Sequence, residues 1–205
     1  MKDVLIFPAI LAVVAWLTLV LQLYLSIRNR ETTLLEAAAR YFSFFTILSS
    51  LLAALCLTAL ATGWGGFWAR LNVPGTLAAA LAYLVVVALV YNILLRGTWE
   101  PRGLRKVLDE LLHVVIPTGY LVVWLIWAPK GGLRWADALV WMIFPVLYSL
   151  VVMGRGALTG FYPYPFLDPR QQGYRAVLRH AALMIPAILA VCLAVVGLAR
   201  GLSGG

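Results

Sequence analysis

The sequence predicts an all-α, polytopic membrane protein, built as a single bundle of six transmembrane helices that forms one domain over residues 1–205. Two compositional observations predict this class. Hydrophobic residues make up 63% of the chain and charged residues only 12%, and the mean hydropathy is +0.95. A soluble domain of this length would have to expose a large apolar surface with such a composition.

The third observation is that the apolar residues are gathered into runs of the length that crosses a bilayer, which takes about 20 helical residues. The runs lie at about residues 4–27, 41–62, 74–95, 105–128, 136–153 and 174–199. The first ends at the polar segment YLSIRNRE, and the fifth is interrupted by Pro145. A proline inside a membrane helix is tolerated where neighbouring helices satisfy the freed carbonyl group. The short connections between runs leave no room for a separate soluble domain.

Lysine and arginine are unevenly distributed between the two sides of this bundle. With six spans, the loops after the first, third and fifth helices share one side and carry eleven of these residues, whereas the termini and the remaining loops carry five. The positive-inside tendency places the eleven-charge side in the cytoplasm and both termini outside, in a multi-pass protein of the cell (inner) membrane. The basic residues border apolar spans and do not form a separate basic domain, which argues against nucleic-acid binding.

The segment VLDELLHVVIP, residues 107–117, carries three ionisable groups at the start of the fourth run. On a helix, either Glu110 (three residues before) or Asp109 (four residues before) can meet His113. In one interpretation both carboxylates remain among the lipid head groups and only His113 is immersed. In the other, the group is a functional site, which is the default hypothesis for ionisable side chains inside a membrane because they are costly to leave unpaired there.

Other polar side chains are predicted at the same depth. Ser43 and Thr46 lie near the start of the second run, Asn92 near the end of the third, and His180 near the start of the sixth. All of these ends reach the eleven-charge side, as does the start of the fourth run with His113. Polar chemistry is therefore expected at one mouth of the bundle, although hydroxyl groups at helical spacing also serve as packing contacts between helices.

Four motifs resemble the androgen-induced-gene family of multi-pass membrane proteins, in its bacterial branch. They are RYFSFFTILSSLL, VYNILLRGTWE, LDELLHVVIPTGY and, most specifically, GALTGFYPYPFLD, which together cover the chain from Tyr41 to about His180. Animal members of the family are intramembrane threonine hydrolases that cleave fatty acid esters of hydroxy fatty acids. The resemblance implies that His113 is the catalytic histidine and Thr46 the nucleophile, although Ser43 also fits the nucleophile position.

The residue types agree with this chemistry. A hydroxyl group needs an adjacent base to act as a nucleophile at neutral pH, and the base needs a third group that fixes its tautomer. Thr46 or Ser43, with His113 and Asp109, can fill these three roles. The G-x-S-x-G turn of soluble serine hydrolases is absent from the sequence, so a hydrolase here would be of the intramembrane type.

The tetrahedral intermediate of acyl transfer also needs donors for its oxyanion. Asn92, a tyrosine hydroxyl group and Arg155 are candidates that the sequence does not rank. The predicted substrate-binding residues are Asn92, Glu110, Arg155, Tyr164, Asp168 and His180. Alternating proline and tyrosine in YPYPFLD also fit a rigid connection at the membrane interface.

No metal or cofactor is predicted. The chain has histidines and carboxylates, but neither an H-x-x-x-H nor a paired E-x-x-H spacing. Three functions remain: a lipid-ester hydrolase that takes its substrate from the bilayer, a transport or lipid-binding protein in which His113 and Asp109 relay a proton, and a bundle whose polar residues only fix helix packing. Transporters commonly show inverted repeats and polar groups near the midplane, and neither is evident. The sequence leaves the oligomeric state open.

Overall fold

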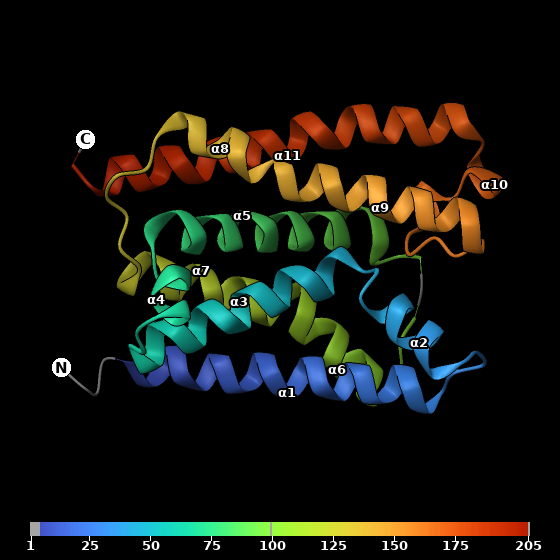
Figure 1. Ribbon diagram of the computed structural model, residues 1–205, viewed down its shortest axis with the longest axis horizontal. Coiled ribbons are helices and arrows are strands. Elements are labelled where there is room, and N and C mark those ends of the chain that lie inside the picture. The colour runs from blue at the N-terminus through green and yellow to red at the C-terminus, as the bar shows by residue number, and fades with distance from the viewer. Residues whose placement is uncertain (1–4, 99, 205) are drawn as a thin grey trace.

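The computed structural model describes residues 5–98 and 100–204, and within them the chain is entirely helical, without strands (Figure 1). The helical segments are α1 (Ile6–Arg28), α2 (Leu34–Tyr41), α3 (Phe45–Thr62), α4 (Phe67–Leu71), α5 (Pro74–Val90), η2 (Tyr91–Leu95), α6 (Leu104–Glu110), η3 (Leu111–Val115), α7 (Ile116–Trp127), α8 (Trp135–Trp141), α9 (Ile143–Thr159), η4 (Pro165–Leu167), α10 (Pro169–Gln172) and α11 (Tyr174–Leu202).

Six helices are long and apolar enough to span a membrane, which confirms the predicted class. The bounds of the six spans are Ile6–Arg28, Phe45–Thr62, Pro74–Leu95, Leu104–Trp127, Trp135–Thr159 and Tyr174–Leu202. The third, fourth and fifth spans each join shorter helical segments end to end. Lys2 and Val4, which the sequence analysis assigned to the N-terminal flank and the first run, lie outside the described residues. The predicted fifth run was too short at its C-terminal end, because the helix continues through a glycine-containing segment to Thr159.

The second span begins four residues later than predicted, because Tyr41 belongs to a separate short helix. The Thr33 hydroxyl group accepts the Glu36 N–H and caps the N-terminus of α2. After Tyr41 the chain turns, and Phe44 takes an extended conformation before α3 starts. This break places Thr46 in the first turn of a new helix, where the first backbone N–H groups have no partners within the helix.

Alanine-rich faces bring the central helices together. Ala53 and Ala54 of α3 and Ala78, Ala80 and Ala82 of α5 have no exposed surface. Small residues let membrane helices approach closely, which strengthens their van der Waals contacts. Around this pair, α1 packs on α3, α7 and α11 pack on α5, and α8 packs on α11.

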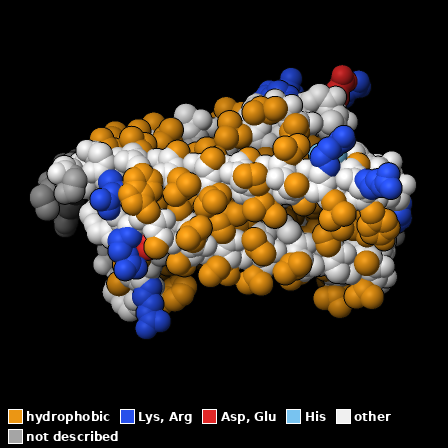
Figure 2. Space-filling model, turned by 90° about the horizontal axis from the view of Figure 1, so that it is seen from above, with side chains coloured by type: hydrophobic (Ala, Val, Ile, Leu, Met, Phe, Trp, Pro, Cys, Tyr) orange, Lys and Arg blue, Asp and Glu red, His pale blue; other side chains and the backbone are white. Residues whose placement is uncertain are grey.

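The outer surface is apolar along the middle of the molecule. Figure 2 shows hydrophobic side chains over most of one face, with lysine and arginine gathered toward its two ends. Leu147, Leu150 and Val151 of α9 and Leu178 of α11 are among the large exposed hydrophobic residues. Such a surface suits contact with lipid tails, and the helices satisfy their own backbone groups there. The chain is therefore a multi-pass membrane protein.

Two spans contain a π-helical turn at the end of the bundle that also carries α2 and α10. The Arg96 N–H bonds to the Tyr91 carbonyl group in η2, and the Ile116 N–H bonds to the Leu111 carbonyl group in η3. Pro117, the second residue after η3, has no N–H to return to the His113 carbonyl group. The start of α1 and the end of α11 lie at the opposite end of the bundle (Figure 1). Single π turns inside α-helices occur frequently at functional sites.

Candidate active site

The structure brings Thr46 and His113 together. The Thr46 hydroxyl oxygen lies 3.4 Å from His113 Nε2, near the outer limit of a hydrogen bond. Thr46 is 8% exposed, and the His113 side chain is 13% exposed. The two residues come from the first turn of α3 and from η3. They can act as a nucleophile and its base, because catalytic hydrogen bonds are often long in the absence of substrate.

The other ring nitrogen of His113 fixes the tautomer. His113 Nδ1 lies 2.8 Å from the Asp109 carbonyl oxygen and 3.4 Å from Asp109 Oδ1. Both neighbours are acceptors, so Nδ1 carries the proton and donates it. A neutral imidazole has one donor and one acceptor nitrogen, which leaves the Nε2 lone pair facing the Thr46 hydroxyl group. This is the tautomer that a general base requires.

Tyr91 completes this arrangement, and the sequence analysis did not identify it. Its ring stacks on His113 with centroids 3.9 Å apart and planes 11° apart, and its hydroxyl group donates to Asp109 Oδ2. Tyr91 begins η2 and His113 lies in η3, so the stack joins the two π-helical turns. Its position in the sequence could have indicated it. Tyr91 directly precedes Asn92 in VYNILLRG, at the end of the third run, which is at the same depth as the start of the fourth.

The Thr46–His113 pair opens onto a cavity of about 360 Å³, which is within the size range of small-molecule sites. The walls are formed mainly by α5, α9 and α11 and are predominantly apolar. Leu150 of α9 and Leu178 and Ile185 of α11 line the cavity and are each at least half exposed. Exposed apolar side chains of α9 and α11 therefore border the cavity.

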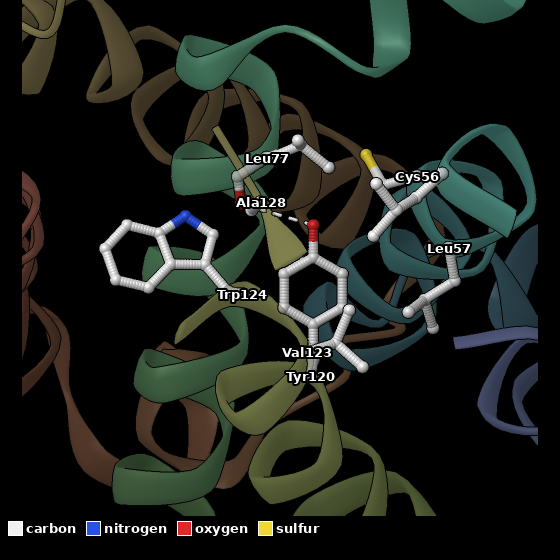
Figure 3. A pocket seen from close by; sticks show the side chains of 8 residues that line it. Cys56, Leu57, Leu77, Tyr120, Val123, Trp124 and Ala128 are labelled. Carbon is white, nitrogen blue, oxygen red and sulfur yellow. Dashed lines mark hydrogen bonds between the residues drawn. The ribbon is translucent and has the colours of Figure 1, made fainter. Parts of the chain in front are cut away.

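The opposite half of the bundle is packed closely. Figure 3 shows the space around Tyr120, whose hydroxyl group donates to the Leu77 carbonyl oxygen at 3.2 Å. Cys56, Leu57 and Trp124 fill its walls and leave no room for a water molecule. A ligand-sized space thus lies at the polar mouth of the bundle, where the candidate catalytic residues are.

Tyr164 brings the YPYPFLD segment into the cavity wall. Its hydroxyl oxygen accepts the Phe45 N–H at 3.0 Å, next to Thr46. Its ring stacks on Phe166, with centroids 5.2 Å apart, and Phe166 meets the ring of His180 edge-to-face. His180 and Phe166 also line the cavity. Two of the predicted substrate-binding residues, Tyr164 and His180, are therefore on the wall.

The structure places the other predicted residues away from the cavity wall. The Ser43 hydroxyl group donates to the Ala39 carbonyl oxygen, which separates it from His113. Asn92 is exposed and bonds to Ala88 and Arg96, whereas its neighbour Tyr91 is buried. Glu110 forms a bidentate ion pair with Arg96 at the surface.

The remaining two predicted residues hold segments around the mouth. Arg155 donates to Glu36 at 2.7 Å, linking α9 to α2. Asp168 is 3% exposed, caps α10 through the Arg170 N–H, and pairs with the Arg170 guanidinium group at 2.8 Å. Hydrogen bonds from Arg170 lower the pKa of Asp168 to about 2. These contacts support the loop that carries Tyr164.

Over residues 5–98 and 100–204, no three histidine, cysteine, aspartate or glutamate side chains lie together as metal ligands. Comparison with protein-family models, with functionally described proteins and with solved structures gives no match for this chain. The resemblance to the androgen-induced-gene family accordingly stays a prediction that rests on the four motifs.

Proposed function

We propose that this protein is an intramembrane hydrolase of long-chain lipid esters, such as fatty acid esters of hydroxy fatty acids, with Thr46 as nucleophile and His113 as general base. One observation carries the proposal: the Thr46 hydroxyl group lies 3.4 Å from His113 Nε2 at the wall of a predominantly apolar cavity. An acyl chain fits the apolar walls, and its ester group would then lie against the only hydroxyl–imidazole pair among the described cavity-lining residues.

The proposed reaction has two halves. His113 Nε2 takes the Thr46 proton while the oxygen attacks the ester carbonyl carbon. The tetrahedral intermediate then expels the alcohol, which takes the proton from Nε2 and leaves an acyl-threonine. In the second half Nε2 takes a proton from water, the hydroxide attacks the acyl carbon, and the proton returns to the Thr46 oxygen as the fatty acid leaves.

Tyr91 and Asp109 serve as positioning residues in this scheme. The Asp109 carbonyl and carboxylate oxygens hold the proton on Nδ1, and the Tyr91 ring fixes the plane of the imidazole. When His113 becomes positively charged in the intermediate, the neighbouring carboxylate stabilises that charge, as in other catalytic triads.

Labelling with a long-chain fluorophosphonate tests the nucleophile. We expect the wild-type protein to be labelled and to hydrolyse a long-chain ester, and Thr46→Ala to do neither. His113→Ala should lose about 10²- to 10⁴-fold in turnover, the usual contribution of a general base, while remaining folded. Ser43→Ala tests the alternative nucleophile and should retain labelling, because the Ser43 hydroxyl group is bound to Ala39.

Two outcomes would contradict the proposal. Equal labelling of Thr46→Ala and the wild type would remove Thr46 as the nucleophile. A well-folded His113→Ala protein with unchanged turnover would remove the base. A wild-type protein that binds a long-chain ester without cleaving it would point instead to the non-enzymatic lipid-binding alternative, for which the cavity alone is sufficient.

A further inference from the structure

The Tyr164 hydroxyl group lies in the first turn of α3, directly beside the proposed nucleophile. Its oxygen accepts the Phe45 N–H at 3.0 Å. Thr46 follows Phe45 directly. Burial raises the pKa of Tyr164, and its contacts with Thr46 and Phe45 oppose that rise. Tyr164 therefore touches the atoms around Thr46, from a loop more than a hundred residues away in the sequence.

The hydrogen-bond arrangement leaves the Tyr164 proton available to a ligand. A phenol hydroxyl group has one donor and two acceptor sites, and the Phe45 N–H at the start of α3 occupies one acceptor site. The O–H must then point away from the backbone of α3. The neighbouring oxygens are those of Thr46 and Tyr148, and both residues line the cavity.

Other oxyanion donors suggested by the sequence are bound elsewhere. The Asn92 amide bonds to Ala88, and its oxygen accepts from Arg96. The Arg155 guanidinium group donates to Glu36. Both lie outside the cavity wall, whereas Tyr164 is part of it.

We propose that Tyr164 is a catalytic residue that donates its hydroxyl hydrogen bond to the carbonyl oxygen of the substrate as that oxygen becomes an oxyanion. This role rests on the proposed hydrolase function. It adds to the nucleophile and the base a group that stabilises the carbonyl oxygen of the substrate. As the Thr46 oxygen bonds to the acyl carbon, the carbonyl π electrons move to the oxygen, which the Tyr164 O–H then stabilises. The Tyr164 proton is not transferred, and the C=O bond re-forms when the alcohol leaves.

The contact with α3 favours Tyr164 as a donor to a developing anion. The N–H group that binds its oxygen belongs to Phe45, at the positive end of α3, and an N-terminal helix dipole favours developing negative charge. The apolar cavity walls exclude water, which strengthens a hydrogen bond to an ion. The α3 helix and the Phe166 stack hold the hydroxyl group in place before the substrate arrives, so little reorganisation is needed.

Steady-state hydrolysis of a long-chain ester by Tyr164→Phe tests the proposal, with Tyr162→Phe as the matched control. Tyr162 lies in the same YPYPFLD segment, where its ring packs against Gly156 and beneath the Arg170 guanidinium group. Removal of one oxyanion donor typically lowers kcat about 10²- to 10³-fold. We expect a fall of that size in Tyr164→Phe with KM changed only a few-fold, and wild-type kinetics in Tyr162→Phe.

A transition-state mimic separates this role from a structural one. A long-chain alkyl trifluoromethyl ketone adds the Thr46 oxygen to its carbonyl carbon and forms a stable oxyanion, whereas the corresponding alkyl ether only occupies the cavity. Tyr164→Phe should weaken inhibition by the ketone by the same factor as kcat/KM and leave binding of the ether unchanged. Equal weakening of both compounds, or a fall in Tyr164→Phe activity matched by Tyr162→Phe, would show that the hydroxyl group only supports the loop.

The experiments distinguish a failure of the proposed role of Tyr164 from a failure of the proposed hydrolase function. If the wild type hydrolyses the ester, Thr46→Ala does not, and Tyr164→Phe equals the wild type, the role of Tyr164 is overturned and the hydrolase stands. If the wild type neither hydrolyses esters nor binds the ketone more tightly than the ether, both are overturned.

Discussion

Replacing Tyr91 with phenylalanine tests the coupling between the two π-helical turns. The substitution keeps the ring that stacks on His113 at 3.9 Å and removes only the hydroxyl group that donates to Asp109. Asp109 is 8% exposed, so water cannot readily replace the lost donor. Leaving a buried polar group without its partner costs about 1–3 kcal/mol.

This cost converts into a measurable shift. For a chain of about 150–250 residues, 1 kcal/mol lowers the melting temperature by about 2–4 °C, so thermal unfolding in detergent should show Tyr91→Phe melting about 2–12 °C below the wild type. Hydrolysis per folded molecule should fall as well, because Asp109 loses the contact that fixes its position beside His113 Nδ1. Tyr83→Phe is the matched control, since Tyr83 lies in the same span, Pro74–Leu95, and its hydroxyl group donates to the Trp141 carbonyl oxygen. It should lose stability and keep its turnover.

A double-mutant cycle gives the refuting result. The double variant Tyr91→Phe/Asp109→Asn removes the carboxylate charge that Tyr91→Phe leaves without a donor. Its free energy of unfolding should therefore exceed the value expected from adding the two single changes. The expected difference is about 0.5–3 kcal/mol, the range for residues in one network. Additive effects, or a Tyr91→Phe protein that melts with the wild type, would show that the hydroxyl group does not hold Asp109.

Three further predictions concern the loop, the cavity and the topology. Arg170 lowers the pKa of Asp168 from 3.8 to about 2, so the pair stabilises the fold above about pH 4 and loses its contribution as the pH falls toward 2. The gap in melting temperature between the wild type and Asp168→Asn should close over that window, and a gap independent of pH would contradict the ion pair. Ala181→Phe, on the cavity wall, should slow hydrolysis of long-chain esters more than that of short-chain esters, and an equal effect on both would place the acyl chain elsewhere. A reporter fused to the C-terminus should lie outside the cytoplasm, because the loops with eleven lysine and arginine residues are expected inside, and a cytoplasmic signal would reverse the topology.

The spans were predictable because their signal is local. Each is a run of apolar residues long enough to cross a bilayer, and the six helices observed follow the six runs closely. The pairing of Thr46 with His113 was expected from their common depth and from the family resemblance, and the two side chains lie 3.4 Å apart. The position of each residue within its apolar run placed both near one end of the bundle. It could not give the distance between the two side chains.

Two features of the site escaped prediction for different reasons. Tyr91 continues the buried face of α5 four residues after Val87 and seven after Leu84, so regular helical periodicity indicated Tyr91 inside, but the sequence analysis considered only the polar Asn92. Ser43 and Thr46 lie three residues apart, a spacing that shares one face in a regular helix. The break at Phe44 separates them into different segments, and only Thr46 reaches the cavity.

The position of the cavity along the helices bears on where a substrate enters. Its lining on α9 runs from Met142 to Met153 and on α11 from Val177 to Ile188, which is about 16 Å of helix in each case at 1.5 Å per residue. This is about half of a hydrocarbon core of about 30 Å. On α11 the lining lies next to the polar mouth, whereas on the span Trp135–Thr159 it occupies the central part. A lipid that enters between α9 and α11 would therefore extend from the mouth toward the middle of the bundle, with its chain along the apolar walls and its ester group near Thr46. The space around Tyr120, toward the other end of the bundle, is closely packed and lined by apolar side chains.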